Sequence, residues 1–266
     1  MIKNVIASLF IALVFLSNGC SKVPVTGRSQ LSLVKNSEII PASFEQYEQV
    51  KKESKLSNDA EQVAMVRKVG TRIQTAVEKY MNENGWGKEL KGYAWEFNLI
   101  EEETVNAWAM PGGKVAFYTG IMPICKDEKG IAVVMGHEVA HAIANHGRER
   151  MSQSMAAQYG MASLSVAMGQ NPTGTQELLM QSIGAGTQLG MLKFSRTHES
   201  EADHLGIIFM AIAGYDPHEA PIFWERMSTQ SGGGAPPEFM STHPSHDTRI
   251  SDLNKWMAEA LKYYQK

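Results

Sequence analysis

The chain has 266 residues, of which 43% are hydrophobic, and its formal net charge is −3. Its length suits one large domain, and its composition is that of a folded globular protein. The slight acidic balance leaves no basic excess for binding nucleic acid, so no nucleic-acid partner is expected. The two cysteines, Cys20 and Cys125, are too few to imply a disulfide framework, and Cys125 fits a small buried hydrophobic residue.

The N-terminus is typical of an export signal. Lys3 precedes an apolar run over residues 5–16, which has the length of a signal-peptide core and is too short to span a membrane as a helix. Gly19 and Cys20 follow, an ending that resembles a bacterial lipoprotein signal, in which cleavage before the cysteine leaves a lipidated N-terminus. Ser17 stands where such signals usually carry leucine, so a plainly cleaved signal is the alternative.

We therefore predict a lipoprotein-type signal peptide over residues 1–19, a lipid-anchored tether over residues 20–36 and a single domain over residues 37–266. Ser21, directly after Cys20, resembles the pattern that sorts lipoproteins to the outer membrane. The expected location is the bacterial periplasm, with a lipid anchor at the outer membrane.

A helical segment and then a small sheet are predicted in the first half of the domain. Residues 37–81 have helical periodicity, with apolar residues spaced by three and four along one face. Alternation over residues 95–99 indicates a half-buried strand, and residues 105–110 and 114–119 form two more extended runs around a turn at residues 111–113. The helical stripe comprises Val66, Val69, Ile73, Val77 and Tyr80.

Helices dominate the second half. Asp127 caps a helix predicted over residues 129–150, and residues 151–192, which are poor in charge, are predicted to form two buried helices. Another helix is expected over residues 193–213. A further helix opens at Asp216-Pro217-His218-Glu219, a capping box with proline at the first helical position. The final helix places its apolar residues on one face, namely Ile250, Leu253, Met257 and Leu261.

The motif His137-Glu138-Val139-Ala140-His141 carries the predicted chemistry. Positions i and i+4 share one face of a helix, so both imidazoles can bind one metal ion. Glu138 can then take a proton from metal-bound water. The apolar residues 131–135 run straight into the motif and predict a buried helix. Uncompensated histidines and a glutamate would be costly in a core, which argues against an ordinary amphipathic helix.

A catalytic zinc site needs a third protein ligand, and the residues leave three candidates. Glu199 and Asp203 share a helix face, so Glu199 could bind the metal while Asp203 accepts a hydrogen bond from a ligand histidine. Glu201 is the second candidate. His146 is the third, because it points about 140° away from His141 if the helix continues. The alternative for residues 199–204 is a surface helix with a charged face.

The H-E-V-A-H motif followed by E-S-E-A-D-H-L-G at residues 199–206 resembles the zinc endopeptidases of the CAAX prenyl protease and HtpX family, peptidase family M48. The segments V-P-V-T-G-R-S-Q-L (residues 23–31), N-A-W-A-M-P-G-G-K-V-A-F-Y-T-G (residues 106–120) and S-T-H-P-S-H-D-T-R (residues 241–249) also resemble it, and the first is similar to the start of its stand-alone bacterial lipoprotein members. The resemblance implies an α+β fold, a mainly helical zincin-type metallopeptidase domain with a small β-sheet packed on the HExxH helix.

The resemblance also implies roles for single residues. Glu199 becomes the third ligand of one Zn²⁺ per chain, and Asp203 supports a ligand histidine. His243 is expected near the metal, where it binds substrate or caps the zinc to hold the enzyme latent, and the glycines at residues 232–234 would let its loop move. The remaining histidines are interpreted as surface or packing residues, namely His146, His198, His204, His218 and His246.

The function expected is that of a zinc metalloendopeptidase of the bacterial envelope. It would cut unfolded or misassembled envelope proteins, held by backbone pairing to the strand at residues 106–110, in protein quality control. The alternative is a proteolytically latent chaperone or assembly factor for outer-membrane proteins on the same scaffold. The expected partners are these substrates and the membrane that holds the lipid anchor.

Overall fold

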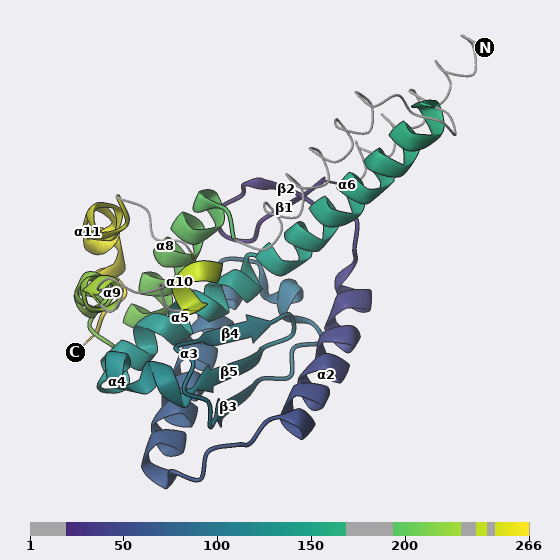
Figure 1. The fold of residues 1–266 in the computed structure, drawn as a ribbon. Helices are drawn as coiled ribbons and strands as arrows, with labels where there is room; N and C mark the ends of the chain where they lie inside the picture. The colour runs from purple at the N-terminus through teal and green to yellow at the C-terminus, as the bar shows by residue number, and fades with distance from the viewer. Residues whose placement is uncertain (1–19, 169–193, 230–237, 244–247, 266) are drawn as a thin grey trace.

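The computed structural model describes residues 20–168, 194–229, 238–243 and 248–265 (Figure 1). The expected signal peptide, the second helix of the 151–192 segment, the glycine-rich loop and His246 lie outside the described residues.

The N-terminal part of the described chain is a hairpin followed by two helices. Strands β1 (Cys20–Lys22) and β2 (Ser29–Leu31) pair antiparallel within the segment that we expected to be a tether. The single helical segment predicted over residues 37–81 is wrong, because helices α2 (Asn36–Glu53) and α3 (Ala60–Glu83) are separate. The chain between them bridges to the sheet, and the carboxylate of Asp59 caps α3. The predicted apolar stripe on α3 is confirmed as buried.

The three predicted strands are confirmed as one sheet, made of β3 (Glu96–Ile100), β4 (Ala107–Met110) and β5 (Lys114–Tyr118). Their order is β3-β5-β4, with β3 parallel and β4 antiparallel to the central strand. The half-buried pattern expected for the first strand is wrong, because residues 97–100 are all buried. Both faces of the sheet are covered, α3 packing on one and Tyr47 of α2 on the other.

Three short elements complete the connections around the sheet: the 3₁₀ helices η1 (Gly87–Leu90) and η2 (Thr119–Ile121) and the α-helix α4 (Met122–Cys125). Cys125, at the end of α4, is buried as expected.

The metal-motif helix is shorter than predicted. Helix α5 (Glu128–Ile143) ends where Asn145 adopts a left-handed backbone conformation with φ of 59°, and α6 (His146–Met168) starts in a new direction. A single helix over residues 129–150 is therefore wrong. Helix α6 extends away from the body (Figure 1), and Met151 is 46% exposed, so the prediction of a buried helix fails there.

Helix α8 (Arg196–Ile212) packs along α5 at very short range. A Cβ atom added at Gly136 of α5 would lie 2.7 Å from the carbonyl oxygen of Gly206 on α8. A Cβ added at Gly206 would lie 3.0 Å from the backbone nitrogen of His137. Glycine is therefore required at this crossing, and the crossing brings the two predicted ligand helices together.

Helices α9 (Glu219–Thr229), α10 (Glu238–Thr242) and α11 (Arg249–Ala260) close the fold around this helix pair. The predicted cap at Asp216 accepts a hydrogen bond from the backbone N–H of His218. On α11, Leu253 and Met257 are buried as predicted, whereas Leu261 is 38% exposed. The mainly helical α+β prediction, with a small sheet beside α5, is confirmed. Within the described ranges, no helix is long and apolar enough to cross a membrane.

Candidate metal centre

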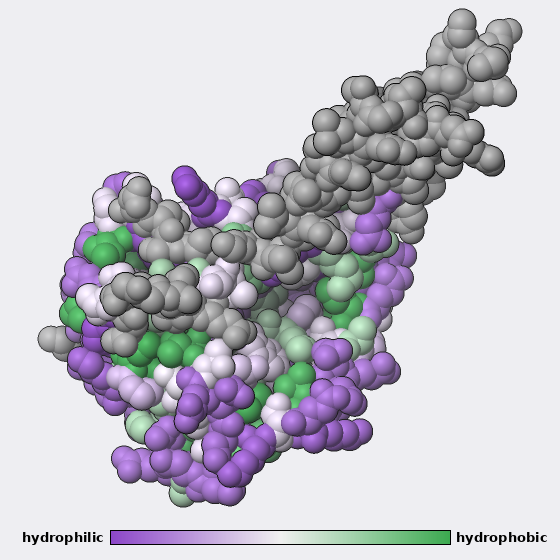
Figure 2. Space-filling view, viewed as in Figure 1, coloured by the Kyte–Doolittle hydropathy of each residue, from purple (hydrophilic) through white to green (hydrophobic). Residues whose placement is uncertain are grey.

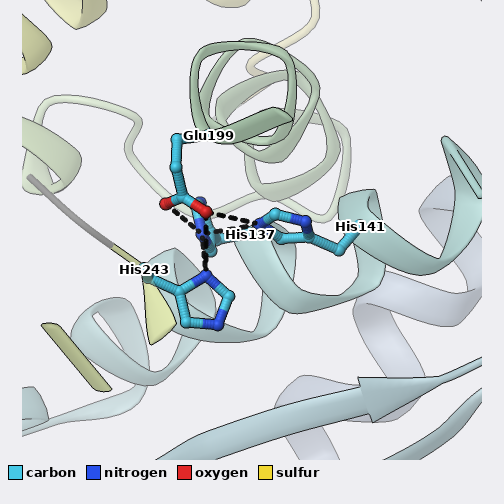
Figure 3. A group of neighbouring side chains, drawn as sticks. All are labelled: His137, His141, Glu199 and His243. Carbon is cyan, nitrogen blue, oxygen red and sulfur yellow. Dashed lines mark hydrogen bonds and ion pairs between the residues drawn. The ribbon is translucent and has the colours of Figure 1, made fainter. Parts of the chain in front are cut away.

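Four buried side chains from three regions of the chain converge on one point (Figure 3). His137 and His141 project from successive turns of α5, Glu199 points at them from the first turn of α8, and His243 approaches from the end of α10. One donor atom from each lies within 4.8 Å of the others. The structure thus brings together the three predicted ligands, His137, His141 and Glu199, and the histidine of the Thr-His-Pro motif.

The spacing of the donor atoms fits a tetrahedral zinc ion. Zinc–nitrogen bonds of about 2.05 Å give a tetrahedron with edges of about 3.3 Å. The Nε2 atoms of His137 and His141 lie 3.1 Å apart, and they lie 3.5 and 3.4 Å from the two oxygens of Glu199. Nδ1 of His243 lies 3.3 Å from His137 Nε2 and 3.1 Å from Glu199 Oε1. Imidazole and carboxylate donors in this arrangement suit zinc.

The electrostatics of the metal-free cluster show what the ion replaces. Burial disfavours charge on His137, but the hydrogen bonds that it donates to the carboxylates of Asp203 and Glu199 outweigh burial and raise its pKa to about 9. Burial lowers the pKa of His141 well below its usual value. Burial also works against the ionised form of Glu199, yet hydrogen bonds from the histidines lower its pKa well below the usual range. A metal ligand must be deprotonated, so a metal ion at this cluster would compete with a proton for Nε2 of His137.

His137 is held by a buried network of ion pairs. Its Nδ1 lies 2.8 Å from Oδ1 of Asp203, as the i, i+4 spacing on α8 predicted. Arg249 of α11 donates to Asp203 through Nε at 2.7 Å and to Glu199 through Nη2 at 3.0 Å. The ring of Trp224 covers the guanidinium at 3.4 Å. The bond to Asp203 fixes the ring so that Nε2 faces the cluster.

His141 is held through a second histidine. The break after α5 turns His146 back, so that its Nδ1 lies 2.9 Å from Nδ1 of His141 and its ring is fully buried. Its Nε2 lies 2.9 Å from Oε2 of Glu201. Neither His146 nor Glu201 belongs to the four-residue cluster. A continuous helix would point His146 away from His141, but the helix breaks at Asn145.

Glu138 is buried beside the cluster. Its Oε1 has no hydrogen-bond partner in the part of the chain that the structure describes, and it lies 3.5 Å from Nε2 of His243. The carboxylate accepts a hydrogen bond from the backbone of Ala109 on β4. Burial raises the pKa of this carboxyl. A buried carboxylate with an unpaired oxygen next to a metal position is what a base that activates water requires.

His243 fills the fourth corner of the cluster. Its ring stacks on Phe239 of α10 with centroids 4.7 Å apart and faces Phe194 at 5.0 Å. The backbone ties this segment down, because Phe239 donates to the carbonyl of Val105 and Phe194 donates to that of Thr242. In this conformation the histidine stands where a catalytic zinc site keeps an open position.

Two arginines at the site were missed by the sequence analysis. Arg249 closes the quoted segment at residues 241–249, and Arg28 lies in the segment at residues 23–31, but neither received a role. Their only signal was membership of those segments, because periodicity and spacing do not say which buried acid a distant arginine meets.

The H-E-x-x-H helix, the carboxylate from a second helix and the edge strand beside them are the features of a zinc metalloendopeptidase. The chain belongs to peptidase family M48, whose family model matches residues 68–257. It is 37% identical over 167 residues to the mitochondrial metalloendopeptidase OMA1 of Schizosaccharomyces pombe, an alignment that covers 62% of this chain and 48% of that protein.

Two further relatives extend the comparison. Identity to the mitochondrial metalloendopeptidase OMA1 of Saccharomyces cerevisiae is 30% over 275 residues, covering 97% of this chain and 76% of that protein. Identity to the beta-barrel assembly-enhancing protease of Escherichia coli is 31% over 181 residues, covering 64% of this chain and 37% of that protein. The chain thus spans about half the length, or less, of several curated relatives that it matches.

Proposed function

We propose that this protein hydrolyses peptide bonds of unfolded or misassembled proteins of the bacterial cell envelope. His137, His141 and Glu199 hold zinc, and Glu138 is the general base. One observation carries the proposal: the buried carboxylate of Glu138 touches the donor cluster through His243 and the edge strand through Ala109. The base thus lies where both a metal and a bound peptide would be within reach.

The residues divide the chemistry between them. Zinc held by His137, His141 and Glu199 would polarise the scissile carbonyl and lower the pKa of a water molecule. Glu138 takes a proton from the attacking water and passes it to the leaving amine. Asp203 and Arg249 keep His137 and Glu199 oriented throughout.

Strand β4 supplies a place for an extended substrate. It is the outer strand of the sheet next to α5 (Figure 1), and among the described residues no strand pairs with its outer edge, where an extended peptide could pair. Figure 2 shows hydrophobic side chains on the same face, to either side of β4, among hydrophilic ones. Unfolded proteins expose extended apolar segments that match such a surface, whereas folded proteins do not.

The envelope location rests on the N-terminal sequence and on one relative. The signal-like residues 1–19 and Cys20 support export and lipidation, and the Escherichia coli relative is named for β-barrel assembly. Other relatives are named as mitochondrial, so the compartment needs its own test. We expect Cys20→Ser to move the protein from the membrane fraction to the soluble fraction. Retention at the membrane in the variant would contradict the lipid anchor.

The test of activity is digestion of unfolded casein by the purified full-length protein, with zinc content assayed alongside. We expect Glu138→Gln to keep one zinc per chain and to lose activity by roughly a hundredfold to ten-thousandfold. The control is Glu45→Gln, the same change at an exposed position of α2, which should leave cleavage unchanged. Zinc-independent cleavage, or full activity in Glu138→Gln, would contradict the proposal.

A second function has one observation in its favour. Because His243 fills the fourth corner, the described conformation leaves no room there for water or substrate, as expected of a latent enzyme or an assembly factor. If His243 caps the zinc, His243→Ala should raise casein cleavage while keeping the metal. If His243 instead binds substrate, the same change should lower cleavage.

A further inference from the structure

A buried polar network joins the N-terminal hairpin to the metal centre. Arg28, in the turn region between β1 and β2, donates from Nε to Oε2 of Glu201 at 2.9 Å. It also pairs with both oxygens of Glu149 on α6, at 3.1 and 2.7 Å. Thr26 of the same hairpin donates to the other oxygen of Glu201. The hairpin therefore contacts α6, which follows the ligand helix α5, and α8, which carries Glu199.

The network continues inward to a ligand. Glu201 lies 2.9 Å from Nε2 of His146, and Nδ1 of His146 lies 2.9 Å from Nδ1 of His141. A second branch runs from Glu149 to Nε2 of His198, at 3.0 Å, and His198 precedes Glu199 in the chain. No other part of the proposed function uses these contacts.

Hydrogen-bond direction along this path sets the tautomer of His141. Glu201 is an ionised acceptor, so Nε2 of His146 must carry the hydrogen that it donates. Nδ1 of a neutral His146 is then an acceptor, so Nδ1 of His141 donates to it. The hydrogen of His141 is thereby fixed on Nδ1, and Nε2, which faces the cluster, keeps the lone pair that a metal needs.

Arg28 keeps the first step of this relay in place. Glu201 is held from two sides, because Arg28 and Thr26 donate to it from the hairpin and Nε2 of His146 lies 2.9 Å from its Oε2. Without the guanidinium, the carboxylate of Glu201 would lose one of these donors and would be freer to rotate. A rotated Glu201 no longer dictates the hydrogen position on His146.

We propose that Arg28 is a positioning residue of the metal centre, acting through Glu201 and His146 to hold His141 in its metal-binding tautomer and orientation. The proposal rests on the assignment of His141 as a ligand in the proposed function. This role would explain the segment at residues 23–31, because the hairpin that begins at Cys20 would then support the zinc site.

The experiment measures zinc affinity of the full-length protein by competition with a chromophoric chelator. We expect Arg28→Met and His146→Leu each to weaken zinc binding by roughly tenfold to a hundredfold. Because both changes break one path, the double variant should be little weaker than the worse single variant. Arg28→Lys should recover part of the loss, since an ammonium still reaches one carboxylate. Lys22→Met, a control on the same hairpin whose Nζ bonds only Ser29 among the described residues, should have no effect.

Two readouts separate positioning from general destabilisation. The visible absorption bands of the Co²⁺-loaded protein should shift in Arg28→Met and not in Lys22→Met, because they report ligand geometry. Unfolding of each metal-free variant shows whether stability changed as well. Zinc affinity of Arg28→Met within twofold of wild type, or additive losses in the double variant, would overturn the inference. Full zinc binding by His141→Ala would instead overturn the proposed ligand set, so the two failures are distinct.

Discussion

The two metal-motif histidines are held by different networks: that of His137 lies within the helical core, and that of His141 ends on the N-terminal hairpin. His137 reaches its carboxylate directly, and Asp203 and Arg249 behind it are buried between α5, α8 and α11. On its Nδ1 side, His141 reaches a carboxylate, that of Glu201, through His146, and the arginine at the end of that path is 24% exposed on the N-terminal hairpin.

This difference separates fold stability from metal binding. The support of His137 is part of the helical core, so breaking it should destabilise the metal-free protein as well as the zinc site. The support of His141 ends at a peripheral hairpin, so breaking it should affect the metal more than the fold.

The largest effect is expected at Arg249. Arg249→Met leaves Asp203 and Glu199 buried without the guanidinium that joins them, and breaking a buried pair costs about 3–5 kcal/mol. Urea unfolding of the metal-free protein measures this loss. Lys68→Met is the control, because its exposed ion pair with Glu128 should be worth less than about 1 kcal/mol. Equal effects of the two changes would remove the distinction between the core support and the rest of the molecule.

The sequence predicted the chemistry of the core support better than its geometry. The i, i+4 spacings placed His137 with His141 and Glu199 with Asp203, because helical periodicity is a local property. The positions of His146, Arg28 and Arg249 depend instead on how the chain turns between its helices and strands. His146 returns to His141 only because Asn145 breaks the helix, and asparagine is the residue type, after glycine, that most readily adopts that backbone conformation. Arg28 and Arg249 come from distant segments, which no local pattern pairs with a given carboxylate.

A medium effect is expected at the helix crossing that both supports share. In Gly206→Ala the new methyl group would lie 3.0 Å from the backbone nitrogen of His137, so α5 and α8 must separate. Overpacking of this kind costs about 1–3 kcal/mol. Because Glu199 moves away with α8, zinc affinity should fall as well, unlike in a purely structural defect.

The matched control for the crossing is Gly147→Ala on α6, where an added Cβ meets nothing within 4 Å. Alanine is the better helix former, so this change should be neutral or stabilise by up to about 1 kcal/mol. Thermal unfolding and chelator competition on both variants check the pair. Tight zinc binding in Gly206→Ala would show that the crossing does not set the ligand distance.

The last effect is expected at the outer edge of the His141 support, and it depends on pH. Burial favours the protonated acid at Glu149, but hydrogen bonds from His198 and Arg28 outweigh it and lower its pKa to about 2. An unfolded glutamate has a pKa of about 4.3, so the unfolded chain takes up this proton first as pH falls. The stabilisation from ionised Glu149 is therefore complete above about pH 5 and is lost between there and pH 2.

Glu149→Gln removes this titration and should flatten the acid side of the stability curve. At pH 7 the variant should be less stable than wild type, and the gap should close as pH falls toward 2, because wild type then loses what the variant never had. Urea midpoints of the metal-free proteins at pH 7, 5, 4 and 3 measure the gap. Asp203 bonds His137 and Arg249, whereas Glu149 bonds Arg28 and His198. The titration of Asp203 therefore contributes equally to both curves and cancels in the difference. Parallel curves would mean that Glu149 contributes no ionised contact to the hairpin, and the His141 support would then end at Glu201.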